Sequence, residues 1–137
     1  MTDTVLEKTI FIDSSPENVW LYITDKDRLG EWFHPANTHL TQGTSYQLLK
    51  EDGDKMCWGR VIEATAPTRL VYSFTHDFMN DGDTIVTWEL SAVHGGTMLK
   101  LTHTGFETAN GNTLNLLISH DKGWDDHFSR LREKAAQ

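Results

Sequence analysis

The sequence is poor in cysteine, in basic residues and in long apolar runs, and each shortage excludes a class of structure or partner. A single cysteine, Cys57, leaves no partner for an internal disulfide, and the cytoplasm is the expected location. Twelve basic residues stand against 20 acidic ones, and the formal net charge of −8 argues against nucleic acids and anionic membrane surfaces as partners. No run predicts a membrane span, and residues 1–7 lack the pattern of a secretory signal.

The chain has enough length for one core and an unusual number of aromatic rings. Its 137 residues are typical of one domain, so we expect a single domain over residues 1–137. Five tryptophans are spread along the whole chain, together with six phenylalanines and three tyrosines. Bulky side chains of this kind fill cores, and they also form the walls of cavities that accept apolar ligands. Composition alone leaves both interpretations open.

The hydrophobic pattern changes its period along the chain and thereby predicts the elements. A Ser-Pro-Glu sequence at Ser15 is typical of a helix start, and apolar residues then follow at helical spacing. From residue 45 onward the period is two, which favours strands. The expected strands cover residues 4–12, 45–50, 56–65, 69–76, 84–93 and 97–103, two short helices cover 16–23 and 27–33, and a long helix covers 112–135.

This order predicts an α+β fold in which a curved antiparallel β-sheet wraps around the long C-terminal helix, with two short helices after the first strand. A sheet with one apolar face needs a cover, and only the last helix is large enough to supply it. Because a twisted sheet that curls around one helix leaves a gap, we expect a pocket between them. The face of this helix turned to the sheet is predicted to carry Leu114, Leu117, Ile118, Trp124, Phe128 and Leu131, with Asp121 in the gap of the stripe.

Histidines and one aspartate fall at inward positions of this arrangement. By strand parity, His76 and His103 point inward, and Asp121 lies on the predicted stripe next to His120. An acid at such a position must be paired, hydrogen-bonded or in contact with water. These groups can form the polar end of the cavity, where they bind the head group of a ligand or act as acid and base. They can equally be structural, with His103 bonded to the last helix and Asp121 accepting from it or from Tyr72.

Arg60 is the unusual residue of its strand. Arg60 shares a face of the strand with Trp58 and Ile62, so it can point inward. There a guanidinium suits a ligand carboxylate or phosphate. It can also pair with an internal acid, or face outward if a bulge shifts the parity.

Cys57 has no basic neighbour and is interpreted as a packed thiol. No two histidines are four apart on a helix and no H-E-x-x-H or C-x-x-C is present, so we assign no metal, no other cofactor and no catalytic residue.

Five segments, in this order, resemble the Hsp90-ATPase-activator-like branch of the START-like, Bet v 1-like (SRPBCC) superfamily. Ile10–Trp20 (IFIDSSPENVW) is similar to the opening of the superfamily, and Asp27–Pro35 (DRLGEWFHP) is similar to the Leu-x-x-Trp segment that follows. Gly59–Leu70 (GRVIEATAPTRL), Leu101–Phe106 (LTHTGF) and His120–Trp124 (HDKGW) resemble three further segments of that branch. Each segment is short, and their shared order makes the resemblance specific.

The resemblance implies a helix-grip fold and no single activity, since members of the superfamily bind lipids, hormones or polyketides and some catalyse reactions. Together with the aromatic content, it leads to the hypothesis of a cytoplasmic protein that binds an apolar or aromatic small molecule between sheet and helix. One alternative is an enzyme, a cyclase, dehydratase or hydrolase, that uses His103 and Asp121. The other is a stress-related interaction module that docks on a chaperone or on a second copy. The ligand-binding residues predicted by the main hypothesis are Trp20, Trp32, Trp58, Arg60, Tyr72, Phe74, His76, Trp88, Leu101, His103, His120, Asp121, Trp124 and Phe128.

Overall fold

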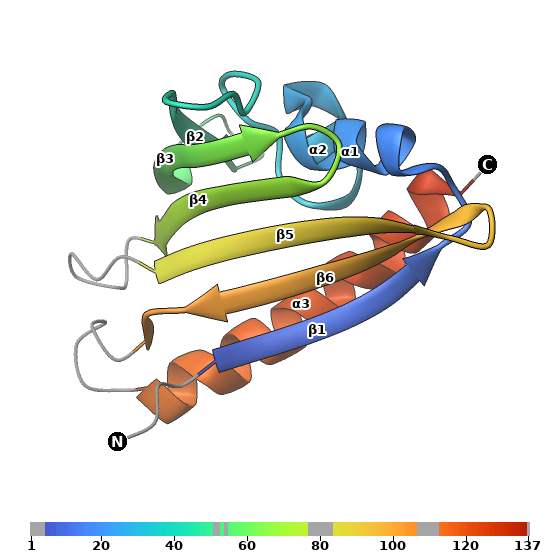
Figure 1. The fold of residues 1–137 in the computed structure, drawn as a ribbon. Helices are drawn as coiled ribbons and strands as arrows, with labels where there is room; N and C mark the ends of the chain where they lie inside the picture. Colours follow the sequence, from blue (N-terminus) through green and yellow to red (C-terminus); the bar gives the residue numbers. More distant parts are fainter. Residues whose placement is uncertain (1–4, 51–52, 54, 77–83, 107–112, 137) are drawn as a thin grey trace.

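The computed structural model describes residues 5–50, 53, 55–76, 84–106 and 113–136. Within them a sheet of six antiparallel strands has the order β1-β6-β5-β4-β3-β2, and the long helix α3 runs behind it alongside β1 and β6 (Figure 1). The α+β helix-grip architecture is therefore confirmed. The elements are β1 (Val5–Ile12), α1 (Pro16–Thr24), α2 (Lys26–Trp32), β2 (Ser45–Leu49), β3 (Lys55–Thr65), β4 (Arg69–His76), β5 (Thr84–Val93), β6 (Gly96–Thr104) and α3 (Thr113–Ala135).

Side-chain caps set the start of both short helices. Ser15 Oγ accepts from the backbone N–H of Asn18 over 3.2 Å, and Pro16 occupies the first position of α1, as the sequence predicted. Asp25 ends α1 and begins α2, because its Oδ1 accepts from the backbone N–H groups of Asp27 and Arg28. One residue therefore serves as the end of α1 and the cap of α2.

A close approach of two strands accompanies an irregularity between β3 and β4. A Cβ atom at Gly59 of β3 would collide with the carbonyl oxygen of Ser73 on β4, so only glycine fits there. The pairing of β3 with β4 also shifts register between Val61 and Glu63. A bulge of this kind bends the bulged strand and increases its twist, which helps a sheet to curve around a helix.

The stripe of α3 that faces the sheet differs from the predicted one in its first half. Its buried positions are spaced by four, four, three and four residues, which is one face of a helix. Leu114 and Ile118 are instead 69 % and 51 % exposed, so their predicted inward positions are wrong. The pattern was misread because these two residues are apolar, whereas the stripe continues through a histidine. Among the side chains of α3 that the structure describes, the buried ones are His120, Trp124, Phe128, Leu131 and Ala135.

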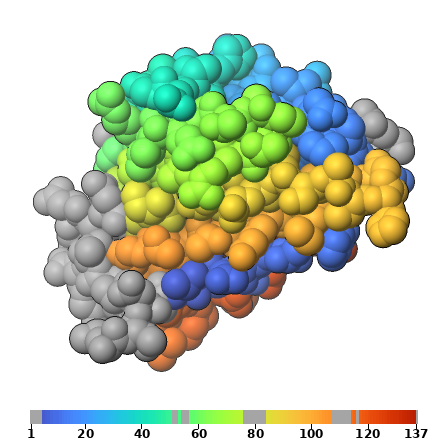
Figure 2. All heavy atoms as spheres, viewed as in Figure 1, coloured from blue at the N-terminus to red at the C-terminus, as the bar shows by residue number. Residues whose placement is uncertain are grey.

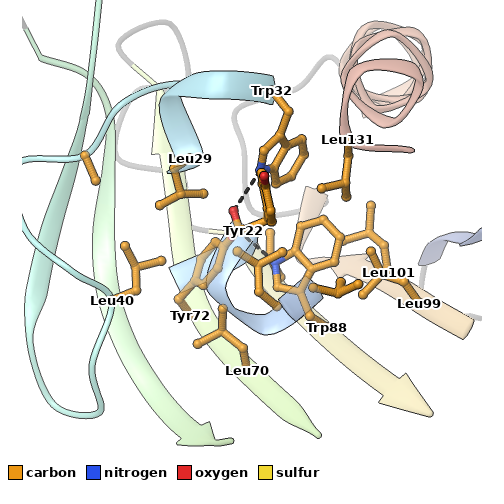
Figure 3. Close-up of a cluster of buried hydrophobic side chains, with 14 of the residues drawn as sticks. Tyr22, Leu29, Trp32, Leu40, Leu70, Tyr72, Trp88, Leu99, Leu101 and Leu131 are labelled. Atoms are coloured by element: carbon orange, nitrogen blue, oxygen red, sulfur yellow. Dashed lines mark hydrogen bonds between the residues drawn. The ribbon is translucent and has the colours of Figure 1, made fainter. Parts of the chain in front are cut away.

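The core between the sheet and the helices is closely packed, and its indole groups are hydrogen-bonded. Figure 3 shows Trp32 of α2 and Trp88 of β5 in this cluster, with Leu131 of α3 beside them. Trp32 Nε1 donates to the carbonyl oxygen of Tyr22 over 2.7 Å, and Trp88 Nε1 donates to the hydroxyl oxygen of Tyr72 over 3.0 Å. None of the described helices is long and apolar enough to cross a membrane.

Candidate functional site

Aromatic rings fill the interior between the sheet and α3. Trp124 of α3 stacks on Phe33 and Phe128, with ring centroids 5.2 and 5.8 Å apart, and meets Trp88 of β5 edge-to-face at 5.4 Å. Trp124 therefore joins α3, the end of α2 and the sheet in one aromatic cluster. The predicted residues that the structure brings into this interior are Trp32, Tyr72, Phe74, Trp88, Leu101, His103, His120, Trp124 and Phe128.

A chain of hydrogen bonds holds His103 at one end of this interior. Trp124 Nε1–H donates to His103 Nδ1 over 3.2 Å, and His103 Nε2 lies 2.7 Å from Thr84 Oγ1. Because Nδ1 accepts, this geometry assigns the ring proton to Nε2, which donates to Thr84. The Thr84 hydroxyl donates in turn to the carbonyl oxygen of Phe74 over 2.6 Å. The structural interpretation of His103, a histidine bonded to the last helix, is confirmed.

His120 lies beside His103 and makes this end of the interior polar. The two imidazole rings meet edge-to-face, with centroids 5.3 Å apart. Phe106 contacts both, at 4.5 Å from His103 and 5.1 Å from His120. All three side chains are buried. They come from the end of β6, the residues after it and the first half of α3, so separate elements converge on this point.

A second polar group lies at the junction of α2 and α3 and was not among the predicted site residues. His34 and His127 meet edge-to-face with ring centroids 5.3 Å apart, and the ring of Phe33 contacts both. Arg130 donates from Nε to the carbonyl oxygen of Trp32 over 3.1 Å and from Nη2 to His127 Nδ1 over 2.6 Å. Arg130 thereby satisfies the last carbonyl of α2. The available signal was the spacing of three residues between His127 and Arg130, which places both on one helix face.

The environment of this group disfavours charge on its histidines. The pKa of His127 is lowered to about 4, first by burial and then by the neighbouring His34 and Arg130. Burial also lowers the pKa of His34, and the charge of Arg130 adds to the effect. Both imidazoles are therefore neutral at pH 7, which agrees with His127 Nδ1 accepting from the guanidinium.

The predicted inward position of Asp121 is wrong. Its Oδ1 lies 2.7 Å from Lys8 Nζ of β1, and its side chain is 51 % exposed. Asp125, one turn further along α3, lies 2.8 Å from the same ammonium group. Burial lowers the pKa of Lys8, but hydrogen bonds to the two carboxylates outweigh that effect and the pKa is raised. Asp121 therefore joins α3 to β1 at the surface and forms no pair with His103.

The predicted inward face of β3 is also wrong. Cys57 and Val61 are wholly buried, whereas Arg60 is exposed and Trp58 is half-buried on the opposite face. Buried Leu48 of β2 pairs directly with Cys57, and directly opposed residues point to the same face of a sheet. Both faces of β3 carry apolar residues, and the face that is buried carries the small thiol of Cys57 rather than the large indole of Trp58. Trp58 and Arg60 therefore do not line the interior.

Two other predicted residues are placed differently or not described. Trp20 of α1 is half-buried and borders a hollow on the outer surface, so its predicted position inside the cavity is wrong. It misled the prediction because it stands between two buried residues at helical spacing, Val19 and Ile23. The side chain of His76 lies outside the described residues. Among the described residues, no three His, Cys, Asp or Glu side chains gather as a metal ion would require.

Comparisons with known proteins agree with this architecture. The chain is similar to the protein MLL2253 from Mesorhizobium loti, with 18% sequence identity, a TM-score of 0.83 and 95% of each chain covered. It is similar to the Aha1 dimer from Colwellia psychrerythraea, with 16% identity, a TM-score of 0.80, and 97% of this chain and 96% of that chain covered. It is also similar to DynU16, a protein of the dynemicin biosynthetic locus, with 21% identity, a TM-score of 0.82, and 96% of this chain but 47% of that chain covered. A search among curated proteins found no match.

At these identities the structural likeness establishes the fold. The family model for Activator of Hsp90 ATPase homolog 1-like proteins matches residues 13–136, which is nearly the whole chain. The match agrees with the resemblance of the five sequence segments. The chain therefore belongs to the family of Activator of Hsp90 ATPase homolog 1-like proteins.

Proposed function

We propose that this protein binds a small apolar or aromatic molecule between the sheet and α3, at the end where His103 and His120 lie. The observation that carries the proposal is this pair of buried, mutually contacting histidines in an otherwise aromatic interior. Sites for small molecules combine apolar walls with a few oriented polar groups, and that combination is present here. The hydrogen bonds of His103 fix the direction of its ring before any ligand arrives.

The walls of this region suit a flat ligand. The rings of Phe106, Phe74 and Trp124 surround His103, with centroids 4.5, 5.7 and 6.1 Å from the imidazole. Aromatic pairs gain from stacked and edge-to-face contacts beyond the apolar area that they bury. The described rings already contact one another, so a ligand has to part them. Phe33, which is only half-buried, lies at the edge of this cluster.

Binding fits this region better than catalysis. A general base needs a lone pair that can reach the substrate, but both ring nitrogens of His103 are engaged in hydrogen bonds. The carboxylate that was predicted to act with it, Asp121, lies at the surface with Lys8. The enzyme alternative therefore lacks the acid–base pair on which it rested. DynU16, which shares the fold, is a protein of a biosynthetic locus, which supports a role connected with a small organic molecule.

Titration with 2-naphthol, followed through the NMR signals of the histidine rings, tests the proposal. We expect saturable shifts of the His103 and His120 signals. Trp124→Phe shrinks the wall and removes the indole N–H that holds His103, so it should change the dissociation constant by about fivefold or more. Trp58→Phe is the matched control, because the same exchange on the outer face of β3 should leave the constant unchanged. No saturable shift of either histidine, or equal effects of the two substitutions, would overturn the proposal.

A second candidate function, self-association, is favoured by one surface feature. Leu114 and Ile118 stand one turn apart on α3 and are 69 % and 51 % exposed. Neighbouring exposed apolar side chains mark contact surfaces when they form a patch. The similar protein from Colwellia psychrerythraea is a dimer. Sedimentation equilibrium tests the candidate: a dimer that Ile118→Lys dissociates supports it, and a monomer at all concentrations rejects it.

A further inference from the structure

The outer surface carries a hollow that is separate from the aromatic interior. It has a volume of about 390 Å³ and lies between α1, residues 39–42 and the end of β3. Figure 2 shows α1, these residues and β3 in the upper part of the view, as blue, teal and green surfaces that adjoin. The apolar part of the lining comes from Trp20, Leu21, Leu40, Ala64 and Ala66. A hollow of this size accommodates an aromatic ring with a short chain.

The lining keeps large apolar side chains in contact with water. Trp20 is half-buried, and Leu21 beside it on α1 is 42 % exposed. The face of α1 that packs into the core is formed by other residues, among them Val19 and Ile23. Trp20 therefore borders the hollow in addition to its contact with the core. An apolar concave surface with polar groups at its edge is typical of a ligand site.

Asp25 places a carboxylate at the edge of this hollow. Its Oδ1 accepts from the backbone N–H groups of Asp27 and Arg28 over 3.0 and 3.1 Å. Its Oδ2 lies 3.7 Å from His39 Nδ1, which is beyond hydrogen-bond distance. That nitrogen accepts from the backbone N–H of Lys26 over 3.1 Å, so in this geometry it carries no proton to donate. Among the described residues, Oδ2 of Asp25 is therefore left without a donor.

The basic side chains next to Asp25 are directed to other partners. Lys26 Nζ lies 3.9 Å from the carboxylate of Asp27, and the guanidinium of Arg28 lies over the ring of Tyr22, 5.3 Å from its centroid. The hydrogen bond from the backbone N–H of Arg28 lowers the pKa of Asp25. Partial burial opposes this effect and the N–H of Asp27 adds to it, so the pKa is lowered overall. The carboxylate is therefore ionised at neutral pH, on a chain whose formal net charge of −8 attracts cations.

We propose that this hollow is a binding site for a small organic cation, an amine carried on an aromatic or apolar body. The ring packs against Trp20 and Leu40, and the ammonium group donates to Asp25 Oδ2. Trp20, which lines the same hollow, carries the ring type that attracts cations most strongly. Leu40 also belongs to the buried core, but none of the hollow's lining residues is among the rings that surround His103, so each of the two sites can exist without the other.

Three ligands that differ in charge test this proposal. The compounds 2-phenylethylamine, 2-phenylethanol and 3-phenylpropionate each carry a phenyl ring on a short chain that ends in a cationic, a neutral or an anionic group. Binding is followed through the indole N–H signal of Trp20 in NMR spectra. We expect the amine to bind about tenfold more tightly than the alcohol, and the carboxylate to cause no saturable shift. The advantage of the amine should shrink as salt is added.

Two single substitutions locate the charge that selects the amine. Asp25→Asn removes the charge and keeps the cap of α2, because asparagine caps helices as well as aspartate does. We expect the amine to bind this variant no more tightly than the alcohol. Glu17→Gln is the matched control: Glu17 is an exposed acid of α1 outside the hollow, and its loss changes the net charge by the same amount. We expect it to leave all three affinities unchanged.

Each failure has a distinct meaning. Equal affinities of the wild-type protein for the amine and the alcohol would overturn the assignment of a cation site. Equal losses in Asp25→Asn and Glu17→Gln would show that overall charge, not Asp25, attracts the amine, and would also overturn it. The absence of a saturable shift of Trp20 with all three compounds would overturn the site itself. None of these results bears on binding in the aromatic interior, which is read from His103 and His120.

Discussion

The aromatic interior and the outer hollow use tryptophan in opposite ways. Trp32, Trp88 and Trp124 are at most 3% exposed, and each indole N–H donates to an acceptor in the core. Trp20 is half-buried and turns part of its surface to the hollow. A ligand in the interior must therefore part rings that already hold the fold together, whereas a ligand in the hollow finds a surface that is already open. Substitutions in the interior should accordingly affect stability as well as affinity, whereas substitutions in the hollow should affect mainly affinity.

The largest effect is expected for Trp124→Ala. This substitution should lower the free energy of unfolding by about 3–5 kcal/mol, the usual cost of removing a buried aromatic side chain. Trp20→Ala should lower it by only about 1 kcal/mol, because that side chain keeps contact with water. Urea unfolding followed by circular dichroism measures both. A loss for Trp20→Ala as large as that for Trp124→Ala would break the distinction between the two regions.

A smaller effect is expected for Thr84→Val, which breaks the hydrogen-bond chain of His103. The side chain keeps its shape, but His103 Nε2–H loses its buried acceptor, and we expect a loss of about 1–3 kcal/mol. Thr102→Val, on the outer side of β6, is the control and should change stability by less than about 0.5 kcal/mol. The ring ¹⁵N shifts of His103 report the same event. Unchanged shifts in Thr84→Val would contradict the hydrogen bond from His103 Nε2 to Thr84 Oγ1.

The group of His34, His127 and Arg130 at the junction of α2 and α3, which we call the rim, predicts a dependence of stability on pH. His127 has a pKa of about 4 in the folded protein, against about 6.5 in the unfolded chain. Between these values the unfolded chain binds a proton that the folded protein does not, so the free energy of unfolding falls as the pH is lowered from about 6.5 to about 4.

The expected loss from His127 is about 1–2 kcal/mol, less than the full shift would give, because the imidazole is only partly buried. Urea unfolding at pH 7 and pH 4.5 measures it. His127→Gln should lose this part of the pH dependence, although the lowered pKa of His34 leaves a smaller dependence in the same direction. Equal pH dependence in wild type and variant would show that the rim is not the cause.

The smallest effect is expected for Asp121→Asn. Its partner Lys8 keeps Asp125, and exposed ion pairs contribute little, so we expect a loss below about 1 kcal/mol. The ring signals of His103 should keep their positions and their pH titration. A changed titration of His103 in this variant would restore the polar pair that the sequence suggested and would contradict the surface position of Asp121.

Periodicity in the sequence was sufficient to predict the order, type and approximate bounds of the elements. The reason is physical: β5 and β6 are buried on one face only, so Val86, Trp88 and Leu90 on one strand and Leu99, Leu101 and His103 on the other alternate without ambiguity. The capping sequence at Ser15 and Pro16 set the start of α1 for an equally local reason.

The sequence failed where two faces of one element were both partly apolar. In β3 the burial of Cys57 rather than Trp58 depends on pairing with β2, which period-two counting does not contain. In α3 the face that is turned to the sheet includes His120, which is buried next to Phe106 and His103. A histidine carries no clear hydrophobic signal, so the pattern did not reveal this face. The rim of His34, His127 and Arg130 was missed because its members come from two helices that meet only in the folded chain.

The most direct test of two separate binding regions is a single ¹⁹F NMR titration of protein labelled with 5-fluorotryptophan. We expect 2-naphthol to shift the resonances of Trp124 and Trp88 and to leave that of Trp20 in place. We expect 2-phenylethylamine to shift Trp20 and to leave Trp124 and Trp88 in place. If 2-naphthol leaves Trp124 unchanged, or if both compounds shift the same resonances, the proposal of an interior site distinct from the outer hollow is contradicted.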